Sequence, residues 1–142
     1  MAKSTTKQSS IDTANFLPSI FIITFLLVGF VPNLDAVDKI APQWLYLSII
    51  NFLCGVFLFI NRKIFKERFV VILTSFISLF YIVFVLWAAL SYFYAINPTE
   101  VLVNIARHFN TLFMFLHLGI LLYNIKDKNR LLSLAIMVIL TI

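Results

Sequence analysis

Charged residues are scarce in this sequence. Asp, Glu, Lys and Arg make up 12% of the 142 residues, against roughly 25% in soluble domains. Hydrophobic residues reach 62% and the mean hydropathy is +1.02. A chain of this size has too few polar side chains to cover an apolar interior. The composition therefore argues against a water-soluble enzyme, a nucleic-acid-binding module and a disordered tail, and it predicts an integral membrane protein that has no nucleic-acid partner.

Cysteine is almost absent as well. Cys54 is the single cysteine and stands in an apolar run, so it has no partner for an internal disulfide. We expect a buried thiol that serves packing.

Long apolar runs occupy most of the chain and predict an all-α polytopic membrane protein, because about 20 apolar residues cross the hydrocarbon core. A Ser-, Thr- and Lys-rich segment, 1–15, precedes them and is expected to be a disordered cytoplasmic tail. The fifth run is too short to cross, so we interpret the chain as four transmembrane helices plus a truncated fifth from a longer protein. A four-span protein with a re-entrant tail is the alternative. The runs of the transmembrane region, 16–142, cover about 16–34, 44–60, 69–96, 98–123 and 131–142.

The distribution of Lys and Arg predicts the orientation. Nine of them lie in the tail and in the connections 61–68 and 124–130, whereas the opposite connections hold Lys39 alone. Because cytoplasmic connections are enriched in Lys and Arg, the N-terminus is expected in the cytoplasm. Aromatic side chains at the span ends fit interfacial belts, although they could instead line a binding surface: Trp44, Tyr46, Trp87, Tyr92, Tyr94 and Tyr123.

One span begins with a strong helix-start signal. Asn97 can cap free backbone amides, Pro98 suits the first helical position, and Glu100 follows three residues after the cap. The sequence therefore predicts a tight outer turn at Asn97, followed directly by the fourth span.

A polar stripe follows on the same helix. At 3.6 residues per turn, Glu100, Asn104, Arg107 and Thr111 share a face about 60° wide, with His108 at its flank. Polar side chains within a span are expected to face protein or a water-filled cavity. Arg107 could form an ion pair with Glu100, contact Asn104 or reach the headgroups. It could also bind a phosphate or diphosphate group that enters from the outer leaflet.

Other polar residues within the spans favour packing over chemistry. We expect His108 to pack or hydrogen-bond rather than act as a general base, and His117 to bond between helices. The two histidines lack nearby Cys or carboxylate ligands, so no metal site is predicted. Thr74, Ser78 and Tyr81 predict a helix-packing seam in the third run.

The segment 69–123 resembles the front part of the bacterial O-antigen ligase and polymerase family. The resemblance rests on Leu-Trp-Ala-Ala-Leu-Ser at 86–91, on Tyr-Ala-Ile-Asn-Pro-Thr-Glu at 94–100, and on Arg107 in the following helix. The earlier spans are similar only in being hydrophobic.

The resemblance implies a helical enzyme of the bacterial inner membrane with about twelve spans and a cytoplasmic N-terminus. Such enzymes transfer glycan from an undecaprenyl-diphosphate carrier to an acceptor sugar at the outer face, without a metal or other cofactor. Arg107 would bind the diphosphate. A large outer loop with essential basic residues is not among these 142 residues, so this portion alone is expected to be inactive.

A non-enzymatic membrane protein is the competing interpretation. A transporter piece would show Gly or Pro near mid-span, whereas Gly55 and Gly119 are single glycines and the prolines stand at span ends. A structural or assembly subunit would use the polar stripe for packing alone.

Overall fold

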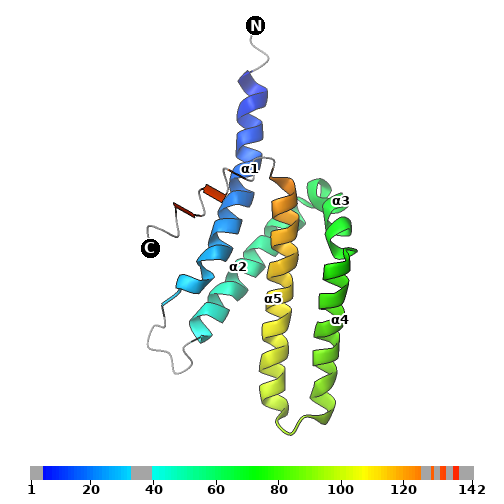
Figure 1. The fold of residues 1–142 in the computed structure, drawn as a ribbon. Coiled ribbons are helices and arrows are strands. Elements are labelled where there is room, and N and C mark those ends of the chain that lie inside the picture. Colours follow the sequence, from blue (N-terminus) through cyan, green and yellow to red (C-terminus); the bar gives the residue numbers. More distant parts are fainter. Residues whose placement is uncertain (1–4, 33–39, 126–128, 130–131, 134–135, 138–142) are drawn as a thin grey trace.

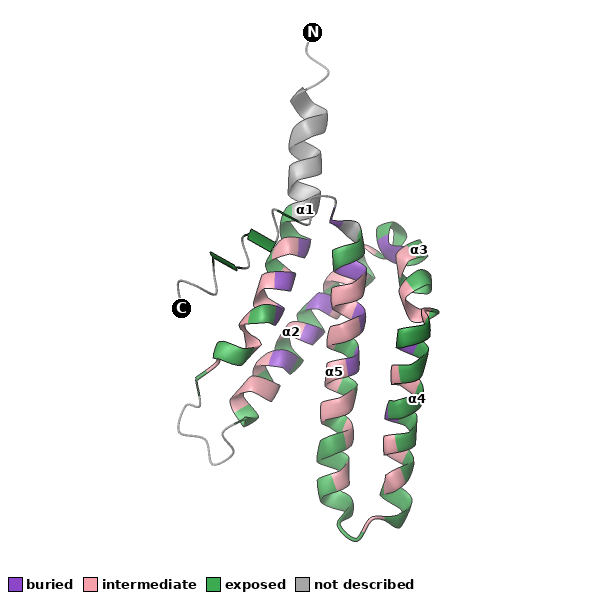
Figure 2. Ribbon diagram, in the orientation of Figure 1, coloured by how far each residue is buried: buried purple, intermediate pink, exposed green. Residues whose placement is uncertain are grey.

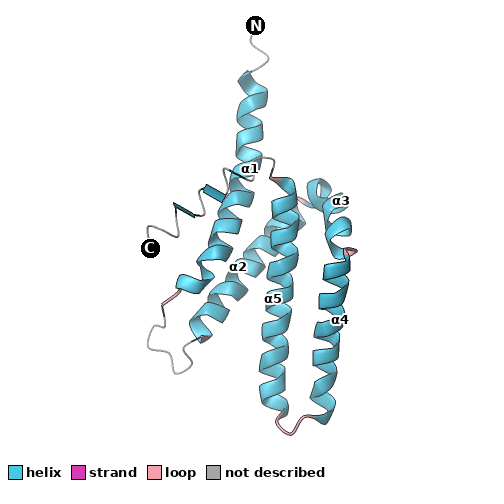
Figure 3. Cartoon of the chain, viewed as in Figure 1, coloured by secondary structure: helices cyan, strands magenta, loops and turns pink. Residues whose placement is uncertain are grey.

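The computed structural model describes residues 5–32 and 40–125, with 129, 132, 133, 136 and 137 beyond them. Every regular element in these parts is helical, as predicted (Figure 3). The order along the chain is α1 Thr5–Leu26, the 3₁₀ helix η1 Leu27–Phe30, α2 Ala41–Ile60, α3 Arg62–Leu73, α4 Phe76–Leu90, the 3₁₀ helix η2 Ser91–Tyr94 and α5 Pro98–Asn124.

Helix α5 is the central element of the bundle. It contacts α1 and α2 on one side and α3 and α4 on the other (Figure 1). One apolar core joins α1, α2 and the C-terminal half of α5, and it includes Ile22, Phe25, Leu47 and Leu121. A second, smaller core joins α4 and α5 around Val85, Leu112 and Leu116.

Three helical segments of the described chain are long and apolar enough to cross a membrane: Ala41–Ile60, Phe76–Tyr94 and Pro98–Tyr123. The apolar segment Phe16–Phe30 is shorter. Many large apolar side chains point outward, among them Phe52 at 71% and Phe93 at 82% exposed (Figure 2). An apolar surface this extensive is compatible with lipid, whereas a soluble monomer exposes only small apolar patches. Most of the predicted fifth span, 131–142, lies outside the described residues.

The third apolar run is not the continuous helix 69–96 that the sequence predicted. Helix α3 ends at Leu73, and α4 begins after Ser75, whose side chain accepts a hydrogen bond from the Ser78 amide. The Thr74 hydroxyl donates to the Val70 carbonyl over 2.8 Å, and the Ser78 hydroxyl donates to the Ile72 carbonyl. Ser and Thr side chains that bond to nearby backbone compete with the helical pattern. Thr74 is exposed at this break and does not join the predicted packing seam, whereas Ser78 is fully buried, as a packing residue is expected to be.

Other boundaries follow the predictions more closely. Helix α5 starts at Pro98 as expected, and the Asn97 side chain accepts from the Glu100 amide over 3.3 Å. Helix α2 starts at Ala41, three residues before the predicted span, because Pro42 is tolerated in a first turn. Helix α1 starts at Thr5, within the segment expected to be disordered. The helix continues back through Pro18, which lies inside α1 and not at its end, and no Gly or further Pro stands in 5–15.

The helices alternate in direction, so their ends gather in two groups. The end of α2, the start of α3 and the end of α5 lie at one end of the bundle (Figure 1). The start of α2 and the turn between η2 and α5 lie at the other end. The basic connection 61–68 is thus at the end of the bundle where α5 terminates. We call this the basic end, and the opposite end the cap end.

Candidate functional site

A polar network lies between α2 and α5, within the apolar spans that these two helices form. The Asn51 amide nitrogen donates to the Asn110 backbone carbonyl over 2.8 Å and also to the Asn110 side-chain oxygen. The Asn110 amide nitrogen donates to the Ser48 hydroxyl over 2.9 Å. The His117 Nδ1 atom lies 3.2 Å from the Asn51 side-chain oxygen. These four residues, Ser48, Asn51, Asn110 and His117, are called the amide network below.

Helical spacing places the network on facing surfaces. Asn110 and His117 are seven residues apart, which is close to two turns of α5, and Ser48 and Asn51 are about one turn apart on α2. Gly55 follows one turn later on α2, and a Cβ atom built there would lie 3.8 Å from the His117 ring. The small residue leaves room for the imidazole, as is common where membrane helices approach closely.

Arg107 lies one turn from Asn110, toward the cap end of α5. Its guanidinium carbon is 5.7 Å from the centre of the Trp44 ring on α2, within the range of a cation–π contact. The Thr111 hydroxyl donates to the Arg107 carbonyl over 3.0 Å. Arg107 is half-buried. The stack on Trp44 therefore directs this cation toward the α2–α5 interface, next to the amide network.

The residues of the predicted stripe have different surroundings in the structure. Glu100 and Asn104 are exposed near the start of α5, and Glu100 bonds with Asn97 at the helix cap. The His108 ring contacts Phe84 of α4 edge-on, with ring centres 5.3 Å apart. Among these residues, Arg107 stacks on Trp44 of α2, His108 contacts α4, and Glu100 bonds within the helix cap.

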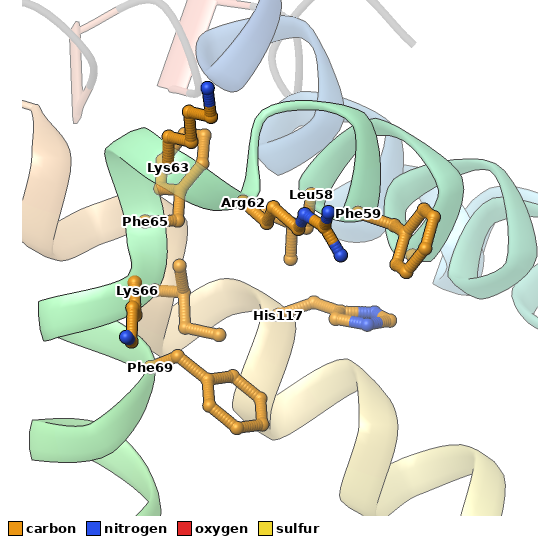
Figure 4. Close-up of a pocket in the computed structure, with 10 residues that line it drawn as sticks. Leu58, Phe59, Arg62, Lys63, Phe65, Lys66, Phe69 and His117 are labelled. Carbon is orange, nitrogen blue, oxygen red and sulfur yellow. The ribbon is translucent and has the colours of Figure 1, made fainter.

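Two cavities follow the α2–α5 interface. One of about 480 Å³ is lined by all four residues of the amide network. The other, of about 600 Å³, lies toward the basic end between α2, α3 and α5 (Figure 4). Gly55, Phe59 and His117 line both cavities. The polar side chains thus stand at the wall of open space rather than in a closed core.

The sequence interpretation missed three members of this site: Ser48, Asn51 and Asn110. A signal was present, because Asn110 and His117 share a face of the fourth span while Asn51 interrupts the second apolar run. Polar side chains at such depths are expected to meet across helices. The prediction that His117 bonds between helices is confirmed by its contact with Asn51.

Cys54 and Tyr81 serve packing, as predicted. Cys54 is fully buried in the core of α1, α2 and α5, as expected. Tyr81 packs edge-on against Phe115 of α5, with ring centres 6.0 Å apart. Within the described chain, no three His, Cys, Asp or Glu side chains gather in a way that could hold a metal ion.

No family model, no curated protein and no solved structure matches this chain. The site and its chemistry therefore supply the argument for function.

Proposed function

We propose that this chain is the N-terminal membrane portion of a glycan transferase that resembles the O-antigen ligases and polymerases. In this proposal it binds an undecaprenyl-diphosphate-linked glycan at the outer face of a bacterial inner membrane. The transfer of glycan to an acceptor sugar would then need further parts of the enzyme. The observation that carries the proposal is the position of Arg107, stacked on Trp44 beside the amide network.

Arg107 has the chemistry that a diphosphate requires. A guanidinium is planar, stays charged, and offers paired N–H donors that match two phosphate oxygens. An arginine within a span is costly to insert and marks ligand pathways more often than lipid contacts. The Trp44 ring lies 5.7 Å from the guanidinium carbon and holds the cation beside α2. We propose that one edge of the guanidinium binds the diphosphate.

We propose two membrane spans in addition to the three long apolar helices: the segment Phe16–Phe30 and the run 131–142. The segment Phe16–Phe30 packs against α2 and α5 through Ile22 and Phe25. This packing supports the proposal that the segment crosses the membrane beside those two helices. The run 131–142 is proposed as the start of a further span on hydropathy alone. The basic end would then face the cytoplasm, together with the N-terminus, and Arg107 would lie in the outer half of the bundle.

The experiment is glycan transfer in cells that express the complete protein with Arg107→Ala or Arg107→Lys. We expect Arg107→Ala to reduce transfer by about 10- to 100-fold, because a hydrogen bond to a charged group contributes roughly 1.5–3 kcal/mol. Arg107→Lys should retain only part of the transfer activity, since an ammonium lacks the paired donors. Arg68→Ala is the matched control, because it removes an arginine that stacks on Tyr123 near the end of α5. Normal transfer by an Arg107→Ala protein at normal abundance would rule out the role of Arg107.

A structural or assembly subunit is the second candidate. It is favoured by the pairing within the amide network, where each side chain finds a partner on the facing helix. In that case, Arg107→Ala would change the thermal stability of the purified protein without changing any transfer reaction. The two candidates are therefore separated by measuring stability and transfer for the same variant.

A further inference from the structure

The cavity at the basic end of the bundle has mostly apolar walls, unlike the polar surroundings of Arg107. It measures about 600 Å³ and lies between the end of α2, the first half of α3 and the C-terminal part of α5. Its walls are mostly apolar, and they include Leu58, Phe65, Phe69 and Ile120. It is large enough to take part of a lipid chain, since binding cavities for small molecules typically measure about 300–1,000 Å³.

Three cations line the same cavity: Arg62, Lys63 and Lys66. No Asp or Glu is among its lining residues, and Glu67 on the same helix points elsewhere, exposed. Arg62 and Lys63 also open helix α3, which has no acidic residue in its first turn. Cations are unfavourable at a helix N-terminus, where the backbone dipole is positive. A bound anion would offset this repulsion and complement the charge of the rim.

The side chains are arranged so that charged and apolar groups meet. Figure 4 shows Arg62 extending over the cavity above His117, with the rings of Phe59 and Phe69 near them. The Arg62 guanidinium carbon is 5.5 Å from the centre of the Phe59 ring. The His117 ring forms the inner wall, where its Nδ1 atom faces Asn51. An amphiphile could therefore place its anionic group at Arg62 and its apolar chain among the phenylalanines.

We propose that this cavity binds one anionic phospholipid of the leaflet at the basic end. The phosphate contacts Arg62 and Lys66, and one acyl chain enters between α2 and α5 toward His117. Basic pockets between membrane helices on the cytoplasmic side are suited to anionic headgroups. This site is separate from the proposed diphosphate site at Arg107 and does not depend on it.

The test is native mass spectrometry of the purified full chain in detergent with added phosphatidylglycerol or phosphatidylcholine of the same acyl chains. We expect one phosphatidylglycerol to be retained at concentrations that leave phosphatidylcholine unbound. The double variant Arg62→Gln with Lys66→Gln should weaken that binding about 30-fold, because each basic residue near an anionic headgroup contributes roughly fivefold. Equal retention of both lipids by the native chain would overturn the proposal.

Arg68→Gln is the matched charge control. Arg68 belongs to the same helix but stacks on Tyr123 and does not line the cavity. It should retain phosphatidylglycerol like the native chain. A loss of about fivefold in Arg68→Gln would show that binding follows the net charge of the surface, and it would contradict a defined site. Circular dichroism on each variant checks that the helices remain folded.

The acyl chain and the headgroup are tested separately. Inorganic phosphate at millimolar concentration should not displace the lipid, since it lacks the apolar part. Gly55→Leu should weaken lipid binding by filling the cavity wall, whereas Gly29→Leu should not, because Gly29 has no neighbour within 4 Å of a built Cβ atom. Displacement by phosphate would indicate a site for a soluble anion and would overturn the assignment to a lipid. Unchanged lipid binding in a folded Gly55→Leu protein would contradict the proposal that an acyl chain enters the cavity between α2 and α5.

Discussion

Helix α5 meets α2 and α4 in two different ways. Toward α2 it presents Arg107, which stacks on Trp44, and also Asn110 and His117, which hydrogen-bond with α2 and line a cavity. Toward α4 it presents Leu112 and Leu116, which are buried against Val85. Both interfaces connect neighbouring helices, yet only the first combines hydrogen-bonding groups with open space. The α4 face therefore packs the bundle, and the contrast supports the proposal that a ligand is recognised at the α2 face.

The same comparison explains why the two histidines of α5 make different contacts. His108 packs its ring against Phe84 of α4, whereas His117 pairs with Asn51 of α2. The residue type is the same, but the helix that each one faces decides its role. A polar residue within a span is therefore informative only once its neighbouring helix is known.

The largest change in stability is expected on the α4 face. Leu116→Ala should lower the free energy of unfolding by about 3 kcal/mol, because it leaves a cavity in an apolar contact. Leu122→Ala is the control on the same helix, since Leu122 is 38% exposed. The measurement is unfolding of the purified protein in a detergent titration. Equal effects of the two variants would mean that the α4 interface contributes little to the bundle.

A smaller change is expected on the α2 face. Asn51→Leu should lower the free energy of unfolding by about 1–2 kcal/mol, because Asn110 and His117 both lose partners. Asn104→Leu is the control at an exposed position of α5 and should change stability by less than about 0.5 kcal/mol. If thermal unfolding showed Asn51→Leu to be as stable as the native chain, the amide network would have no part in holding α2 against α5.

The smallest expected change in stability is the difference between alanine substitutions at two glycines, Gly55 and Gly119. At Gly119 a Cβ atom would lie 3.1 Å from the Ile72 Cγ2 atom of α3, whereas at Gly55 the nearest atoms are 3.8 Å away. Alanine favours a helix over glycine at both positions, but only Gly119→Ala forces a neighbour to move. Gly55→Ala should therefore be more stable than Gly119→Ala by about 1 kcal/mol. The reverse order of thermal unfolding temperatures would show that α3 can move away from α5.

Much of the fold could be predicted from the sequence because hydropathy and cap residues act locally. The apolar runs predicted α2 and α5 to within a few residues, and Asn97 predicted the start of α5. The break at Thr74 and Ser75 was missed because hydropathy does not register hydroxyl groups that bond to nearby backbone carbonyls. The extension of α1 to Thr5 was missed because polar composition alone suggested disorder.

The candidate site was predicted only in part, and the reason is geometric. Helical spacing grouped Arg107 with Glu100 and Asn104 on one face, but it could not show which side chains of the other helices lie opposite that face. The structure places Arg107 over Trp44, which is 63 positions earlier in the chain. The pairing of Asn51 with Asn110 likewise depends on how α2 packs against α5. Contacts of this kind between distant parts of the chain could not be read from a single apolar run.

The most direct test of the account is equilibrium binding of a short prenyl diphosphate to the full-length protein in lipid nanodiscs. The α2 face of α5 is predicted to bind the diphosphate through Arg107, so Arg107→Gln should raise the Kd at least about tenfold. Arg68→Gln should leave it unchanged, because Arg68 stacks on Tyr123 near the opposite end of α5. A Kd for Arg107→Gln equal to that of the native protein would contradict the assignment of this face to ligand recognition.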